Sequence, residues 1–479
     1  MQSSDLRLAQ RNADFFKTNF SQSNEHYAVS LRKAKRSEHL KKKRKIILSL
    51  NTKEISSIMD TLNELYSYID IEIPTDRTFQ LISEFQIFLY SGGCINQFLP
   101  SILKIFQSFL HILQKSTNIE LLKELTLVFC ILTSEYNILI QDRRKMCITN
   151  ILISTLKFSN ILILKNSILS IGNLSIDSEE GLNEILNSNF LPTLQKSLNN
   201  FQKLPMKIIK ITAWTLANLC GKKSNLTTDQ SIIILEILKK HIISIYSKSI
   251  NDAMRALMGI SYKSESISQC IIDQGLVPFI FTSTKNNSES ISLCALKTIG
   301  NMLSWLPTQT QVLINMGVLD IIQNKTSSTN PNIRKQGFWA LSNIASGTSA
   351  QVAELIDHDI MKFVFYGLLD SDISTRKEAS VAICNLTTSA CQSSLLILLE
   401  KGILKYLSKS LEDSDITVRE NSLIALWELL KATSSTDTDL FKSLEYSEFM
   451  NELDRVFFNT HGEHQVIEEL YRIIENNDN

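Results

Sequence analysis

Residues 337–351 read GFWALSNIASGTSAQ, and this stretch places a tryptophan and an asparagine four positions apart in a run of small and apolar residues. Four residues are just over one turn of an α-helix, so Trp339 and Asn343 are expected on one helical face. A buried and unpaired asparagine amide would cost about 1–3 kcal/mol. The spacing therefore predicts either a structural asparagine with buried partners or an exposed face that binds a ligand.

The stretch is one copy of a repeat. Its asparagine recurs at intervals of 45, 83, 42 and 42 residues, and the long interval halves in DAMRALMGISY (252–262), where Gly259 replaces the asparagine. Apolar runs introduced by Gly or Pro, such as GLVPFI (275–280), GVLDII (317–322) and GILKYL (402–407), predict a second helix before a third helix that carries the Trp/Asn segment. The copies are SILSIGNLSID (167–177), TAWTLANLCGK (212–222), CALKTIGNMLS (294–304), GFWALSNIASG (337–347) and ASVAICNLTTS (379–389).

A period near 42 residues with two or three helices per unit is typical of armadillo and HEAT arrays. The third helix favours armadillo, and the prediction is an all-α, right-handed superhelical solenoid whose third helices line one concave groove. The alternative is an irregular helical bundle with coincidental asparagines. We expect a basic segment at 1–50, armadillo repeats over 51–440 and a C-terminal capping repeat with an acidic tail at 441–479.

Composition supports a helical chain with a polarised charge. The 479 residues include only 14 Gly and 7 Pro, which leaves few turn formers. The formal charge is zero overall, but residues 31–45 carry +8 and residues 46–479 about −8. The eight cysteines form no C-x-x-C pair and are expected to be reduced in an intracellular protein. We also expect neither a signal peptide nor a membrane span, and hence a soluble protein.

The sequence gives little indication of catalysis. Its seven histidines show no H-E-x-x-H spacing, and there is neither a P-loop nor a G-x-G-x-x-G motif. We therefore expect a protein that is not an enzyme and that needs no metal or cofactor.

With the period, the Trp/Asn pair and the basic arm together, the chain resembles importin-α, the adaptor that links basic nuclear localisation signals to importin-β. The arm VSLRKAKRSEHLKKKRK (29–45) resembles the importin-β-binding segment, and EFMNELDRVFFNTHGEHQVIEELYRII (448–474) resembles the last repeat, where the export factor binds. The resemblance implies shuttling between cytoplasm and nucleus, with cargo proteins, importin-β and an export factor as partners, and without membrane or direct nucleic-acid binding.

The resemblance also implies a mechanism for the groove. A row of asparagine amides can both donate to and accept from the backbone of an extended peptide. Tryptophan rings would wall in Lys or Arg stems, with a cation–π attraction of about 0.5–2 kcal/mol, and carboxylates would bind their charged ends. The C-terminal, or minor, site would use Trp339, Asn343, Asn301, Lys297, Thr310, Glu378 and Asn385, with Lys297 in place of the usual Arg and Val381 in place of a second Trp.

The N-terminal, or major, site departs further from the family pattern. Leu127 and Leu169 replace two tryptophans, Ile131 replaces an asparagine, and Arg255 with Gly259 takes the place of another pair. Arg255 would repel a basic peptide unless it is paired, so we expect the minor site to carry more of the binding. The major-site residues implied by the resemblance are Asn173, Asp177, Trp214, Asn218 and Asp252.

The basic arm has two roles in this interpretation: as a helix it would bind importin-β, and unbound its KKKRK (41–45) would occupy the protein's own groove as an autoinhibitor. The family's Arg cluster upstream of this segment is missing, and SNEHYA (23–28) stands there. The residues concerned are Arg32, Lys33, Lys35, Arg36, Lys41, Lys42, Lys43 and Arg44.

Each assignment has a structural alternative. The tryptophans could be core residues, the asparagines structural amides, the acids ordinary solvated carboxylates, and the arm a solvated charge run or a nucleic-acid-binding tail. We call the recurring Trp and Asn positions of successive third helices the ladder, and the pair of one repeat a rung. Trp305 and Trp427 fit no ladder position, and we expect them to pack against neighbouring residues. For the whole protein, the alternatives are a non-transport armadillo scaffold that binds extended peptides of other partners, and a nucleic-acid-binding solenoid, which the acidic body disfavours.

Overall fold

The computed structural model describes residues 60, 63–64, 74–91, 95–135, 148–221, 224–243 and 250–433, and among these residues the secondary structure is helical, without strands. The chain divides into two units, unit 1 up to Gly259 and unit 2 from Ile260. The predicted basic segment (1–50) and C-terminal unit (441–479) lie outside the described residues.

Unit 1 contains α4 (Asp76–Ser91), α5 (Ile95–Lys115), α6 (Ile119–Glu135), α8 (Ile148–Thr155), α9 (Ile161–Asp177), α10 (Glu179–Leu186), α11 (Phe190–Asn199), α12 (Met206–Leu219), α13 (Thr228–Ile237), the π-helix η2 (Leu238–Ile243) and α14 (Ile250–Ser261), whose last two residues belong to unit 2. Unit 2 continues with α15 (Glu265–Asp273), α16 (Val277–Thr284), α17 (Glu289–Leu303), α18 (Pro307–Asn315), α19 (Val318–Thr326), α20 (Pro331–Ala345), α21 (Ser349–Asp357), α22 (Met361–Gly367), α23 (Ile373–Ser389), α24 (Gln392–Glu400), α25 (Leu404–Ser410) and α26 (Ile416–Thr433).

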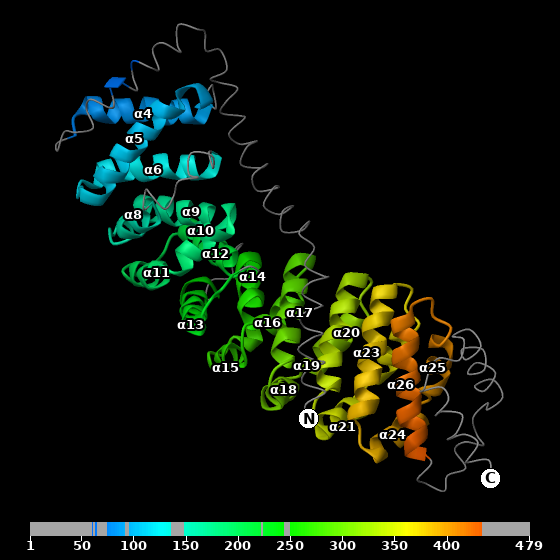
Figure 1. Cartoon of the computed structure of the whole chain (residues 1–479). Helices are drawn as coiled ribbons and strands as arrows, with labels where there is room; N and C mark the ends of the chain where they lie inside the picture. Colours follow the sequence, from blue (N-terminus) through cyan, green and yellow to red (C-terminus); the bar gives the residue numbers. More distant parts are fainter. Residues whose placement is uncertain are drawn as a thin grey trace. The chain divides into compact units, whose positions relative to one another are not determined.

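The helices follow the predicted three-helix repeat. In unit 2, α18 and α19 are short, and α20, which holds Trp339 and Asn343, is the third helix of their repeat. The third helices α17, α20, α23 and α26 pack side by side, as Figure 1 shows in green, yellow and orange. Within unit 1, α6, α9 and α12 are consecutive neighbours in the same way. The sequence period therefore corresponds to one armadillo-type repeat.

The second helices begin where the glycines predicted. Gly317 adopts a left-handed φ of 87° directly before α19, and Gly275 and Gly402 have φ values of 69° and 78° before α16 and α25. This backbone region is costly for residues with a Cβ, so a glycine allows the tight turn between the first and second helices. The position of these turns could therefore be read from the sequence.

The core of each repeat lies between its helices. On α20, Phe338, Leu341 and Ile344 recur every three residues and are each at most 1% exposed. Helix α20 packs on α19, whose Leu319 and Ile322 are also buried. Every residue of α20 from Gln336 to Ala345 is buried, so this part of the helix is enclosed on all sides by its neighbours. No helix of the described part is long and apolar enough to cross a membrane.

Candidate functional site

Trp339 and Asn343 lie on α20 as predicted, but both side chains are nearly buried, with 4% and 6% exposed. The indole of Trp339 lies against Gly300 on the preceding third helix, α17, so closely that a Cβ at Gly300 would collide with the ring. The same arrangement recurs in unit 1, where the ring of Trp214 lies against Gly172 of α9. In both places a glycine directly before an asparagine, Asn173 or Asn301, makes room for the next repeat's tryptophan.

The asparagine amides of unit 2 join neighbouring repeats. Asn343 Nδ2 donates to the carbonyl oxygen of Gly300 at 2.9 Å, and Asn385 Nδ2 donates to that of Ser342 at 2.9 Å. On α17, Asn301 Nδ2 donates to Ser261 Oγ at 2.9 Å. These bonds give the asparagines structural partners, which is one of the two alternatives that the sequence predicted. An amide can both donate and accept, and binding of these amides to a peptide backbone stays a prediction.

Three further minor-site residues lie on the same group of helices or next to it. Thr310 is 3% exposed, and its hydroxyl donates to Leu303 O at 3.3 Å. Lys297 is half-buried on α17, one turn before Asn301, and burial lowers its pKa. Nearby Cys294 opposes this shift in pKa and Lys335 adds to it. Glu378 is half-buried on α23. The predicted minor-site residues therefore lie on α17, α18, α20 and α23, and α17 contacts α18 and α20 while α20 contacts α23; their action as one site stays a prediction.

The predicted major-site residues lie on α9, α12 and α14 of unit 1. Asn173 Nδ2 donates to Thr133 Oγ1 at 3.1 Å, again towards the preceding third helix. Trp214 and Asn218 are half-buried on α12, and the buried Nδ2 of Asn218 has no hydrogen-bond partner among the described residues. Asp177 is the last residue of α9, and its side chain is outside the described part.

Asp252 and Arg255 form an ion pair on α14, with Arg255 Nη1 3.2 Å from Asp252 Oδ1. From the sequence, Arg255 is expected to repel a basic peptide unless its charge is paired, and Asp252 is that partner. Gly259, in the asparagine position of the same helix, allows close packing, since a Cβ there would collide with the carbonyl oxygen of Cys220 at the end of α12. The missing asparagine is thus explained by backbone contact.

The arm residues are not part of this geometry. Arg32, Lys33, Lys35, Arg36, Lys41, Lys42, Lys43 and Arg44 lie outside the described residues, as does the segment 448–474. Their roles stay predictions.

Sequence reasoning missed a second set of bonds between repeats, made by glutamines. Gln351, which ends the opening stretch, forms a capping box with Thr348 and donates from Nε2 to Pro307 O at 2.7 Å. Gln309 and Gln230 donate in the same way to Glu265 O and Leu186 O, each 44 residues earlier. The Thr-x-x-Gln pattern at the start of α13 and α21 is a recognised helix start, so the sequence indicated these two caps but not the bonds to the preceding repeats.

Arginines on the third helices also cross between repeats. Arg334 donates from Nε and Nη2 to the two carboxylate oxygens of Asp370, both at 2.7 Å, and from Nη1 to Ser328 O. Arg376 pairs likewise with Asp413 of the next repeat. Hydrogen bonds to these carboxylates raise the pKa of both guanidinium groups. Neighbouring repeats of unit 2 are therefore joined by aromatic, amide and ionic contacts.

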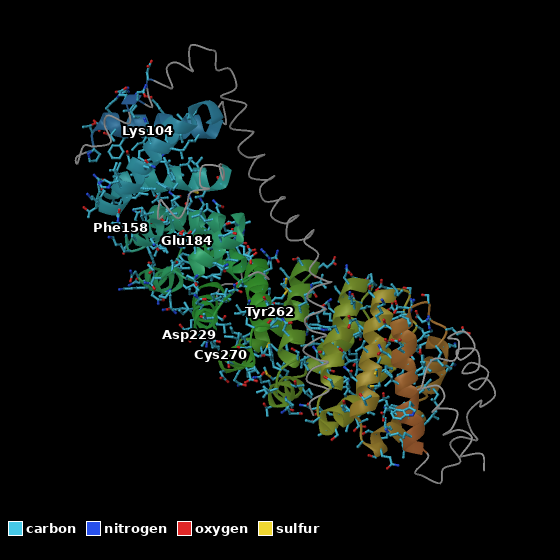
Figure 2. All side chains as sticks on the ribbon, in the orientation of Figure 1. Lys104, Phe158, Glu184, Asp229, Tyr262 and Cys270 are labelled. Carbon is cyan, nitrogen blue, oxygen red and sulfur yellow. The ribbon has the colours of Figure 1, made fainter. Side chains whose placement is uncertain are left out.

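The two remaining tryptophans have packing partners. Trp305 Nε1 donates to Ser261 O at 3.1 Å. Ser261 is followed in the chain by Tyr262, which is labelled in Figure 2. Lys431 Nζ lies 4.2 Å from the centroid of the Trp427 ring. The described part of the chain contains no cluster of three or more His, Cys, Asp or Glu that could hold a metal ion.

Comparisons with known proteins give matches to importin alpha subunits. No family model matches the chain. It is 29% identical over 178 residues to importin subunit alpha-1a of Oryza sativa subsp. japonica, covering 37% of this chain and 33% of that protein. It is also 29% identical over 217 residues to importin subunit alpha-8 of Arabidopsis thaliana, covering 45% and 48%. The matches thus span about a third to a half of the length of these relatives.

Among solved structures, the chain resembles an engineered protein from a structural genomics programme. The TM-score is 0.61 at 19% identity, and the match covers 78% of this chain and 98% of that one. At this identity the likeness concerns the fold alone. In sequence the chain is thus similar to importin alpha subunits over part of its length, and its described residues form all-helical repeats of the armadillo type.

Proposed function

We propose that the chain is a nuclear import adaptor that binds Lys/Arg-rich localisation signals on its third helices. The observation that carries the proposal is the set on unit 2, where Trp339 and Asn343 of α20 lie between Asn301 of α17 and Asn385 of α23. An extended peptide needs partners for its backbone groups, and amides repeated at one period can supply them. The sequence similarity to importin-α subunits supports this use of the repeat.

Cargo recognition in this proposal is by binding and involves no catalysis. The stem of a ligand lysine or arginine would pack beside Trp339, and Glu378 would attract its charged end. Asn173, Trp214 and Asn218 would form a second, weaker site in unit 1, where leucines replace two tryptophans. Unit 2 would therefore carry most of the affinity.

The proposal extends to the ends of the chain. The arm would bind importin-β and, when unbound, would compete with cargo, because tethering gives a short flexible segment an effective concentration of about millimolar. An export factor would bind the segment 448–474, and the protein would shuttle between cytoplasm and nucleus. Support for these steps is the sequence pattern of the two segments.

The test is a titration of a labelled Lys/Arg-rich peptide by fluorescence anisotropy at two salt concentrations. We expect binding to the full chain, tighter binding when Lys41, Lys42, Lys43, Arg44 and Lys45 are replaced by Ala, and weaker binding in Trp339→Ala. Trp427→Ala is the matched control, because this tryptophan lies outside the ladder. Equal binding by the Trp339 and Trp427 variants would exclude the proposed site, and unchanged binding without the arm charges would exclude autoinhibition.

A second candidate function, a scaffold for peptides that are not localisation signals, is favoured by the charge on the same face. Lys297 and Lys335 lie close enough for Lys335 to lower the pKa of Lys297. Two adjacent cations disfavour a uniformly basic ligand. An acidic peptide of equal length, added to the same titration, distinguishes the candidates, because a scaffold of this kind would bind it more tightly than the basic one.

A further inference from the structure

In unit 1, Arg255 is paired with Asp252, one of the carboxylates predicted to bind a basic side chain of the ligand. On α14, Arg255 Nη1 donates to Asp252 Oδ1 at 3.2 Å, and the two side chains are 16% and 21% exposed. Charges that are partly withdrawn from water attract each other more strongly than an exposed pair does. The carboxylate of Asp252 is therefore strongly engaged by its own helix.

The register of α14 places this ion pair in the ladder. Arg255 follows Trp214 by 41 residues and Gly259 follows Asn218 by 41, so they take the tryptophan and asparagine positions of their repeat. The contact between Gly259 and the Cys220 carbonyl fixes the end of α14 directly against the end of α12. Arg255 thus takes the tryptophan position of the repeat that follows Trp214.

We propose that Arg255 is a built-in competitor for the basic side chain of the ligand, and that it makes unit 1 select a carboxylate or another acceptor at this rung. This inference rests on the proposed peptide-binding function. A ligand lysine would have to displace a tethered guanidinium from Asp252, and tethering raises the effective concentration of the resident cation. A ligand carboxylate would instead add to the pair.

The chemistry of arginine and the neighbouring charges fit such a preference. A guanidinium has five N–H donors in a fixed plane, so it can bind Asp252 and a ligand acceptor at once. Lys210 lies on α12 one turn before Trp214, and the first turn of that helix contains no acidic residue. Among the described side chains, Lys210 therefore adds a second cation near Trp214, which favours an acidic ligand residue.

The experiment compares a basic peptide with versions in which Glu replaces each Lys or Arg in turn. Each peptide is titrated against two proteins, one with Arg255 and one with Arg255→Ala. Both proteins also carry Trp339→Ala and Asn343→Ala, which suppress the unit 2 site. With Arg255 present, we expect one position at which Glu binds at least as well as Lys. In Arg255→Ala, we expect Lys to be preferred there by about three- to tenfold.

Controls keep this test decisive. Arg255→Gln retains most of the side-chain stem and should show the same reversal if Arg255→Ala fails to fold, which thermal unfolding reports. Arg376→Ala removes an arginine from an ion pair in unit 2 and should leave the preference unchanged. An identical positional preference with and without Arg255 would overturn the inference, whereas the absence of any peptide binding to the parent chain would overturn the proposed function itself.

Discussion

The indole ring of Trp339 lies against Gly300, the residue that also accepts the hydrogen bond from Asn343. One rung of the ladder thus contacts a single residue of the preceding third helix twice, through an aromatic face and through an amide. The same glycine is one residue before Asn301, so the contact couples two successive rungs. Changes in this contact are expected to affect the stability of the array as well as its ligand face.

Replacing Gly300 with Ala should displace the Trp339 ring, because the new Cβ would collide with it. Overpacking of this kind costs about 1–3 kcal/mol. We expect Gly300→Ala to lower the free energy of unfolding by this amount, measured by urea denaturation. The double variant Gly300→Ala/Trp339→Leu removes the collision, so its loss should be smaller than the sum of the two single losses. Additive losses would show that the ring and the glycine are not coupled.

The amide bonds between repeats should contribute to stability in the absence of any peptide. Asn343→Ala and Asn385→Ala each delete a bond of 2.9 Å to a backbone carbonyl, so each should lower the free energy of unfolding by about 1 kcal/mol. Asn343→Asp, which keeps the shape but loses the donor, should be no better. A variant that unfolds like the parent and only loses peptide would assign the amide to ligand binding alone.

Gln351 allows a helix cap to be separated from a bond between repeats. Gln351→Glu keeps an oxygen that can accept from Thr348 N, but it loses the donor to Pro307 O and places a carboxylate near that carbonyl. We expect a loss of about 1–3 kcal/mol in the free energy of unfolding. Thr348→Ala, which breaks only the cap, should cost about 1 kcal/mol. Equal losses would mean that the contact with Pro307 contributes nothing.

Lys297 should give unit 2 a pH-dependent stability. Burial lowers its pKa in the folded chain below the ordinary 10.5, so the unfolded chain binds more protons between the two values. Stability should therefore rise with pH through that window, as the buried ammonium is neutralised. Lys297→Met lacks the titrating group, and its unfolding curves should show a smaller rise between neutral and alkaline pH. A parallel rise in both proteins would contradict this.

Cys391 should be the most reactive thiol at neutral pH among the described cysteines. It is exposed, and hydrogen bonds from the hydroxyls of Ser393 and Ser394, each at 3.2 Å, lower its pKa to about 7. Its rate of alkylation by iodoacetamide, followed by mass spectrometry, should reach half its maximum near pH 7. In Ser393→Ala/Ser394→Ala this midpoint should rise by at least one pH unit. An unchanged midpoint would exclude the hydroxyls as the cause.

The repeat, the third helices and the second-helix starts were predictable because they depend on local rules. Trp339 and Asn343 recur at a fixed period, and Gly317 marks a turn that requires a left-handed residue. The partners of the amides were not predictable, because spacing along one helix places a side chain on a face without showing what the neighbouring repeat offers it. The Gly300 carbonyl that binds Asn343 is 43 residues away in sequence.

The candidate site was predictable to a similar degree. The sequence predicted that the Trp and Asn residues lie on consecutive third helices, and in unit 2 they lie on α17, α20 and α23, while Thr310 lies on the first helix α18. It could not show that Asp252 binds Arg255, since both are common surface residues and an i, i+3 pair is only one of several outcomes. The cross-repeat pair of Arg334 with Asp370 was also hidden, because its 36-residue separation differs from the period.

Cross-linking tests the central claim, peptide binding beside Trp339, most directly. A Lys/Arg-rich peptide with a photoreactive group at its basic positions would be irradiated with the full chain, and the adducts mapped by mass spectrometry. We predict that the adducts concentrate on α17, α20 and α23 and decrease in Trp339→Ala but not in Trp427→Ala. Adducts that lie mainly on the first and second helices, such as α19 and α22, and that persist in Trp339→Ala would contradict the account.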